Sequence, residues 1–124
     1  LIIHESILTE FEQTAKSDFV VTIDGADAAV DLCSRSVAKD NSLQDYHSRI
    51  LGNAPCTGHS ECDAILVGSG RVNAAPELFA GHTDASLIHE AAIGKIAGEQ
   101  LTKLMTMGLD EKEAEEMIIR GFLQ

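Results

Sequence analysis

Residues 87–96, LIHEAAIGKI, lie where the spacing of the apolar residues changes along the chain. Before this segment, apolar and polar residues alternate with the period of two that a half-buried strand shows. After it, Leu101 and Leu104 begin the spacing of one helix face. The segment therefore separates a β part, residues 1–95, from a carboxy-terminal helical hairpin, residues 96–124.

The β part consists of short strand patterns that end at turn residues. Alternation is clearest in AAVDLCSRSVA (28–38) and LQDYHSRILGN (43–53). Further strands are expected at 19–25, 62–70, 71–78 and 84–91. Because no helical pattern separates them, these strands indicate either a sandwich or the coils of a β-helix. We expect residues 1–18 to be irregular or helical.

The helical hairpin has two segments with helical spacing. GEQLTKLMTMG (98–108) ends in a glycine suited to a helix end. LDEKEAEEMIIRGF (109–122) begins at Asp110, with Glu113 three residues later, the spacing of a capping box. Helices of this length are unstable alone. Their apolar faces must therefore dock on the β part or on another protein.

Charge and hydropathy exclude several classes of partner. The chain has 124 residues and a net charge of −11, with 9 Lys and Arg against 20 Asp and Glu. It therefore lacks the basic stripe that nucleic-acid binding requires. It also lacks the ~20-residue apolar run of a membrane span and the basic start of a signal peptide. Three cysteines without a disulfide framework favour the cytoplasm.

The sharpest metal-like spacing is Cys56-x-x-His59-x-x-Cys62. Thiolates and an imidazole within seven residues could hold zinc or iron. No clear fourth ligand follows, and Cys62 begins an expected strand that could simply bury its thiol. A small metal-binding protein that uses these three residues is our alternative hypothesis for the function.

His89 and Glu90 occupy the junction between the β part and the hairpin. In one interpretation, strand alternation buries one side chain and exposes the other, and the imidazole is simply hydrogen-bonded. In the other, the pair offers metal ligands or a proton acceptor at the rim of the β part. A zinc hydrolase is excluded, because Ile93 stands where its motif requires a second histidine.

The sequence shows no other signature of an enzyme. The glycines of GSG (68–70) are followed by a strand pattern rather than by a helix, so they do not form a phosphate-binding loop. A β-helical carbohydrate-active enzyme is disfavoured, because aromatic platforms and an obvious pair of catalytic carboxylates are missing. We therefore expect a protein that is not an enzyme.

Two segments resemble a known family. HEAAIGKIAGEQLTKLMTMGLDEKEAEEMIIRGF (89–122) resembles the carboxy-terminal signature of the SufB/SufD family, the scaffold proteins of SUF iron-sulfur cluster assembly. CDAILVGSGRVNAAPEL (62–78) is similar to the last β-helix coils of that family. The resemblance implies a right-handed parallel β-helix followed by a small helical domain.

The resemblance also implies partners and sites. Members of the family bind the ABC-type ATPase SufC through their helical domain, and SufB and SufD meet at their β-helix ends as protomers of a dimer. A transient iron-sulfur cluster forms near that interface, where the matching residues here are His89 and Glu90. The expected docking residues for a SufC-like ATPase are Gln100, Leu101, Leu104, Glu115 and Glu116.

One departure bears on the role within the family. SufB-type members have a cysteine shortly after the turn that corresponds to residues 67–70. This sequence reads Gly70-Arg71-Val72 there. The missing thiol favours a SufD-like or otherwise simplified member.

Overall fold

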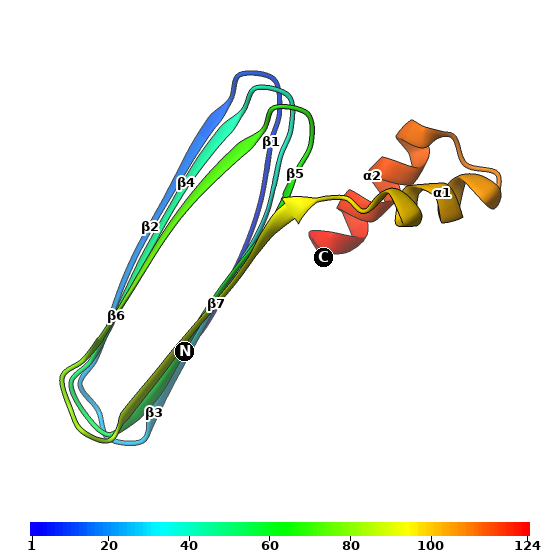
Figure 1. The fold of residues 1–124 in the computed structure, drawn as a ribbon. Coiled ribbons are helices and arrows are strands. Elements are labelled where there is room, and N and C mark those ends of the chain that lie inside the picture. Colours follow the sequence, from blue (N-terminus) through cyan, green and yellow to red (C-terminus); the bar gives the residue numbers. More distant parts are fainter.

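The computed structural model describes the whole chain, Leu1–Gln124. Seven strands are followed by two helices (Figure 1). The strands are β1 (Ile2–Thr9), β2 (Thr14–Ile23), β3 (Ala28–Ala38), β4 (Leu43–Gly52), β5 (Cys56–Leu66), β6 (Arg71–Ala80) and β7 (Ala85–Lys95). The helices are α1 (Gly98–Thr106) and α2 (Glu111–Phe122).

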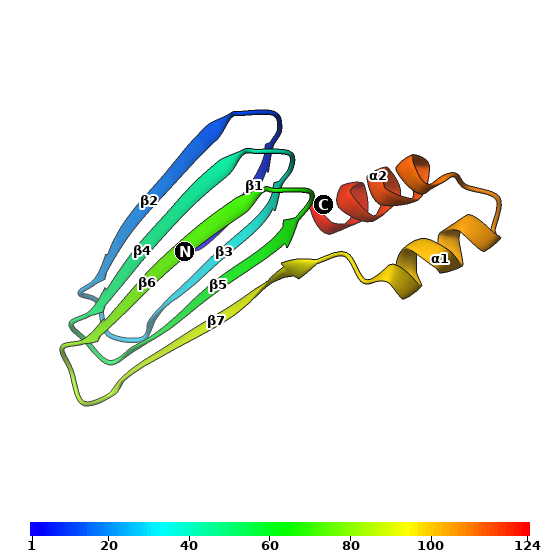
Figure 2. The same ribbon diagram turned by 45° about the horizontal axis from the view of Figure 1, so that its top comes forward.

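The strands form two parallel sheets that face each other as the walls of a flattened solenoid (Figure 2). One sheet has the order β1-β3-β5-β7 and the other β2-β4-β6. Each coil places one strand in each sheet, so Ile2 pairs with Asp31 and Asp31 with His59. This arrangement confirms the expected parallel β-helix coils followed by two helices.

Residues 1–18 differ from the expectation, because they form β1 and the first half of β2. Their local pattern is weak, but every residue of β1 has a partner on β3. Pairing with the next coil therefore supplies the hydrogen bonds that make this segment extended.

The solenoid interior is apolar at one end and polar at the other. Ile23, Val30, Ile50 and Cys56 form a buried apolar cluster near the turns that lead into β3 and β5. Toward the opposite turns, the inward-facing carboxylate of Glu5 accepts hydrogen bonds from the hydroxyls of Ser17 and Ser34. Because these serine, threonine, glutamine and glutamate side chains have partners within the coil stack, a polar interior is tolerated there. These contacts are Ser17 Oγ to Glu5 (2.7 Å), Ser34 Oγ to Glu5 (2.8 Å), Gln44 Nε2 to Thr9 Oγ1 (2.9 Å) and Ser42 Oγ with Thr9 Oγ1 (2.9 Å).

The turns at this polar end repeat from coil to coil. Phe11, Asp40 and Gly68 hold the same place in successive turns and have φ angles of 55°, 57° and 65°. The Asp40 carboxylate accepts a hydrogen bond from the Phe11 backbone N–H at 2.8 Å, which ties the first two turns together. Each of these turns thus requires one residue with a positive φ angle, and in the third turn that residue is a glycine, which adopts this conformation without strain.

The hairpin attaches to the solenoid through its second helix. The Asp110–Glu113 capping box that the sequence predicts is present at the start of α2. Ala114 and Ile119 of α2 are buried, whereas α1 buries no residue. Neither helix has the length and hydropathy needed to span a membrane.

Candidate functional site

The outer face of the four-stranded sheet carries a row of metal-ligating side chains. The strand register places His4, Cys33, Glu61 and Glu90 opposite one another on the four successive strands. Their neighbours along the strands point into the solenoid, so alternation directs all four outward. Adjacent strands lie about 4.8 Å apart, and the row therefore brings imidazole, thiol and carboxylate groups onto one surface.

The next row adds a histidine that lies between two carboxylates. His59 Nδ1 lies 2.9 Å from Asp31 Oδ1, and His59 Nε2 lies 3.0 Å from Glu90 Oε2. The ligand atoms of His59, Glu61 and Glu90 all lie within 4.8 Å of one another. We call these three residues the His59 cluster.

Neighbouring carboxyl groups shift the pKa values of His59 and Glu61. Hydrogen bonds to Asp31 and Glu90 raise the pKa of His59, because both carboxylates favour the imidazolium. The Asp63 carboxyl beside Glu61, together with partial burial, raises the pKa of Glu61. Metal binding at this cluster would therefore release protons.

Cys33 lies in a small cavity beside the His59 cluster. The cavity has a volume of about 270 Å³. Its walls are His4, Glu5, Ser6, Asp31, Cys33, Arg35, Glu61 and Gln124. Burial, and then the nearby Glu61 carboxylate, raise the pKa of the Cys33 thiol. The thiol thus shares its cavity with a carboxylate of the His59 cluster.

Strand alternation separates His89 from Glu90. Glu90 points outward and belongs to the His59 cluster. His89 points into the solenoid, where its Nδ1–H donates a hydrogen bond to the Ser60 carbonyl at 3.2 Å. The two residues therefore lie on opposite faces of β7, and only Glu90 is a direct candidate ligand.

The structure does not bring Cys56, His59 and Cys62 together as a metal site. Cys56 and Cys62 are buried with their thiols toward the interior, whereas His59 faces outward from the same strand. Burial raises the pKa of Cys62 to about 11, which disfavours the thiolate that a metal requires. Residues three positions apart on a strand point to opposite faces, so His59 lies on the other face from Cys56 and Cys62. The motif spacing alone does not show this, because it does not say that the segment is a strand.

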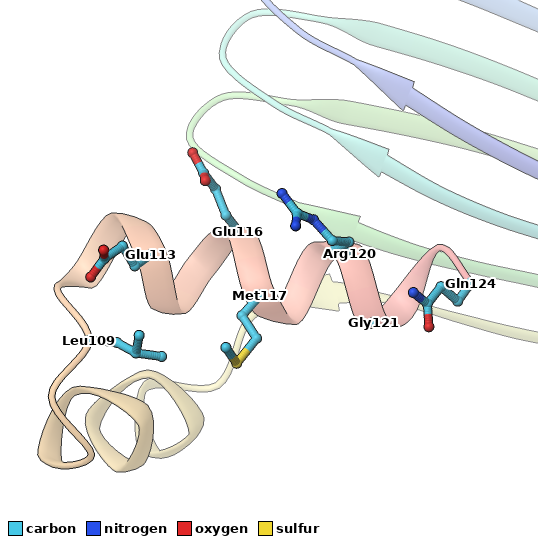
Figure 3. A pocket seen from close by; sticks show the side chains of 7 residues that line it. All are labelled: Leu109, Glu113, Glu116, Met117, Arg120, Gly121 and Gln124. Carbon is cyan, nitrogen blue, oxygen red and sulfur yellow. The ribbon is translucent and has the colours of Figure 1, made fainter.

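The predicted docking residues lie along the hairpin. Gln100, Glu115 and Glu116 are polar members of this set, and Leu101 and Leu104 are its half-buried apolar members. A groove of about 420 Å³ lies on α2 (Figure 3). Of the predicted residues, only Glu116 lines it; the other walls are Leu109, Glu113, Met117, Arg120, Gly121 and Gln124.

Glu61, Cys33 and Asp31 belong to the site but were not predicted from the sequence. They carry no local motif, because their partners lie one coil away in the sequence. The signal that could have found them is the coil repeat, since Asp31 and His59 are 28 residues apart and His59 and Glu90 are 31 apart.

Comparison with known families agrees with this architecture. Residues 3–122 match the family described as "SUF system FeS cluster assembly, SufBD core domain". The chain belongs to the SufBD family. Because the match extends through nearly the whole chain, it includes the first coil as well as the hairpin.

Several relatives in the SufBD family come from archaea. The chain is 39% identical over 113 residues to an iron-sulfur cluster assembly SufBD family protein of Methanocaldococcus jannaschii, a match of 90% of this chain and 36% of the relative. For similarly named proteins of Methanothermobacter thermautotrophicus and Archaeoglobus fulgidus, identity is 38% over 105 residues and 39% over 102 residues. Those matches span 83% and 81% of this chain but only 26% and 27% of the relatives.

Proposed function

We propose that this SufBD-family chain contributes the surface on which a nascent iron-sulfur cluster is held, as a scaffold rather than an enzyme. The observation that carries this proposal is the convergence of three ligand atoms within 4.8 Å in the His59 cluster. Two carboxylates and an imidazole suit Fe²⁺, and a thiolate suits a cluster iron. Cys33 lies on the adjacent strand, β3, directly opposite Glu61 of β5 in the strand register.

His89 has a positioning role in this proposal. Its hydrogen bond to the Ser60 carbonyl joins β7 to β5 directly behind the His59 cluster. The adjacent Glu90 is 66% exposed and is held only from the outer side by His59. An anchored backbone at His89 thus sets where the Glu90 carboxylate can reach.

Binding of Fe²⁺ to the iron-free protein under anaerobic conditions tests the site. We expect Glu61→Gln and Glu90→Gln each to weaken Fe²⁺ binding by about tenfold or more, as the loss of a metal ligand does. Glu77→Gln is the matched control, because Glu77 bonds His47 at 2.6 Å on the opposite sheet in a similar bridge. Equal Fe²⁺ affinity in all four proteins would refute the site.

Cluster assembly is tested separately by reconstitution with iron and sulfide, followed by visible absorption. We expect Cys33→Ser to abolish or strongly reduce the cluster absorption. His89→Ala is expected to reduce it less, because His89 only positions a ligand. Undiminished absorption in Cys33→Ser would remove this thiol from the proposed ligand set.

We further propose that the hairpin docks a SufC-like ABC ATPase. The helices present exposed apolar side chains, of which Met105, Met107 and Met117 are 45%, 73% and 51% exposed. Such a surface on a hairpin attached through one helix is typical of an interaction site. The docking residues named from the sequence, Gln100, Leu101, Leu104, Glu115 and Glu116, lie on the same two helices.

Charge reversal of Glu116 tests the docking. Glu116 lines the α2 groove, whereas Glu115 pairs with Lys39 of the solenoid at 3.6 Å and is less suitable. We expect Glu116→Lys to weaken binding of a SufC-like ATPase most strongly at low salt. Asp45→Lys, on the outer face of the other sheet, serves as the control. Equal binding by both variants would contradict docking at this groove.

A SufB- or SufD-like protomer is the second proposed partner. β6 and β7 end their sheets and leave unpaired backbone groups along one side. Phe79 and Ile88, on these edge strands, are 62% and 56% exposed. Because Glu90 lies on β7, a second protomer at this edge would adjoin the His59 cluster. We expect Ile88→Asp to lower the molecular mass measured by light scattering from that of a dimer to that of a monomer.

A further inference from the structure

The carboxy-terminal end of α2 is directed toward the four-stranded sheet (Figure 2), and Gln124 lines the Cys33 cavity. Ser6 Oγ donates a hydrogen bond to the Leu123 carbonyl at 2.9 Å. Arg35 Nη1 donates one to the backbone oxygen of Gln124 at 3.2 Å. Ser6 and Arg35 are partners in the strand register, two residues beyond His4 and Cys33 on their strands. The helix end is therefore bonded to the row next to the ligand row.

The body of α2 covers an apolar part of the same face. Val37 points outward by alternation, yet its exposed fraction is 0%. Ile119 of α2 is only 6% exposed and lines a cavity together with Leu8, the register partner of Val37. The burial of Val37 is therefore explained by α2 lying over it.

Few interactions hold α2 in this position. Apart from the Ile119 contact and a cavity that Phe122 shares with Ile65 and Ile93, they are the two hydrogen bonds at exposed atoms and the ion pair between Lys39 and Glu115 at 3.6 Å. Because α1 buries no residue, it adds no anchor of its own. A segment with so little buried apolar surface can separate from the sheet without unfolding the solenoid.

Gln124 connects the two sides of this helix. It lines the Cys33 cavity and also the α2 groove beside Met117 (Figure 3). A partner bound in the groove would therefore contact a residue that also lines the cavity. Movement of the helix end would change access to the thiol.

We propose that the end of α2 is a strap that covers the Cys33 side of the site and restricts access to the Cys33 thiol. The importance of this strap for cluster assembly rests on the proposed function, in which Cys33 is a ligand of the cluster. The closure itself is a property of the iron-free chain and can be measured alone.

The rate at which Cys33 reacts with a thiol reagent in the iron-free protein tests the strap. We expect Ile119→Asp to increase this rate by about tenfold or more, because an ionised side chain cannot stay buried against the sheet. Met117→Asp is the matched control: it adds the same charge to the same helix, at a side chain that is 51% exposed. The buried Cys56 and Cys62 report on the integrity of the solenoid when mass spectrometry assigns the labelled sites.

A second variant guards against helix unfolding as the cause. Ser6→Ala leaves α2 unchanged and removes only the hydrogen bond to Leu123, so we expect a smaller increase in the Cys33 rate. Equal Cys33 rates in wild type, Ile119→Asp and Ser6→Ala would overturn the strap. An equal increase in Met117→Asp would also overturn it. Unchanged Fe²⁺ binding in the Glu90→Gln variant would contradict only the proposed function, so the two proposals can fail separately.

Discussion

The turn between β5 and β6 offers a sharp test of how closely the coils stack. A methyl group on Gly70 would lie 2.0 Å from the Ala38 carbonyl oxygen and 2.4 Å from its carbon. Both atoms belong to the backbone of the preceding coil, so no side chain can rotate to make room. We therefore predict that Gly70→Ala strongly destabilises the solenoid.

The size of this effect follows from the movement that the turn must make. Separations under 3.0 Å are essentially never observed for a Cβ atom, so the 2.0 Å contact requires a shift of the turn. The shift would break the hydrogen bonds from Val67 N–H to the Ala38 carbonyl (2.9 Å) and from Arg71 N–H to the Ser42 carbonyl (3.0 Å). Two lost bonds at about 1 kcal/mol each and overpacking of about 1–3 kcal/mol give about 3–5 kcal/mol.

Urea and thermal unfolding followed by circular dichroism measure the prediction. For a domain of this size the loss corresponds to a decrease in Tm of roughly 10–20 °C. Gly94→Ala is the matched control, because a methyl group there meets nothing within 4 Å. We expect Gly94→Ala to be neutral or slightly stabilising. If Gly70→Ala were as stable as Gly94→Ala, the stacking argument would be refuted.

Two further predictions concern titratable groups. Glu77 and then Asp18 raise the pKa of His47 by accepting its hydrogen bonds, so this bridge stabilises the fold below the ordinary pKa of about 6.5. That stabilisation is lost as the pH rises through the raised pKa. The urea midpoint of the wild type should therefore fall as the pH rises over this range, and we expect a smaller fall in His47→Gln. Identical curves of urea midpoint against pH in the two proteins would contradict the prediction. Burial raises the pKa of Cys62 to about 11. At about pH 8 we therefore expect Cys62 to be alkylated only after unfolding, as checked by mass spectrometry; rapid labelling of the native protein would disagree.

Much of the fold could be predicted from local patterns. Alternation located β3 and β4 almost to their ends, and the Asp110 capping box located the start of α2. The first coil was missed, because the extended form of residues 1–18 depends on pairing with residues that lie one coil later. The start of β5 was also placed too late, since its polar first half pairs with β3 rather than following a clear local pattern.

The sequence by itself determined that the chain alternates into strands before residue 95 and that a helical hairpin follows. It placed Glu90 at the junction between them, whereas Glu90 lies in the middle of β7. These features depend on neighbours within a few residues. Only the tertiary structure decided that Glu90 joins His59 and Glu61, while Cys62 turns inward. The physical reason is that parallel coils bring together residues about 28 to 31 positions apart. The alternation of side chains along each strand then decides which of these residues point to the same face.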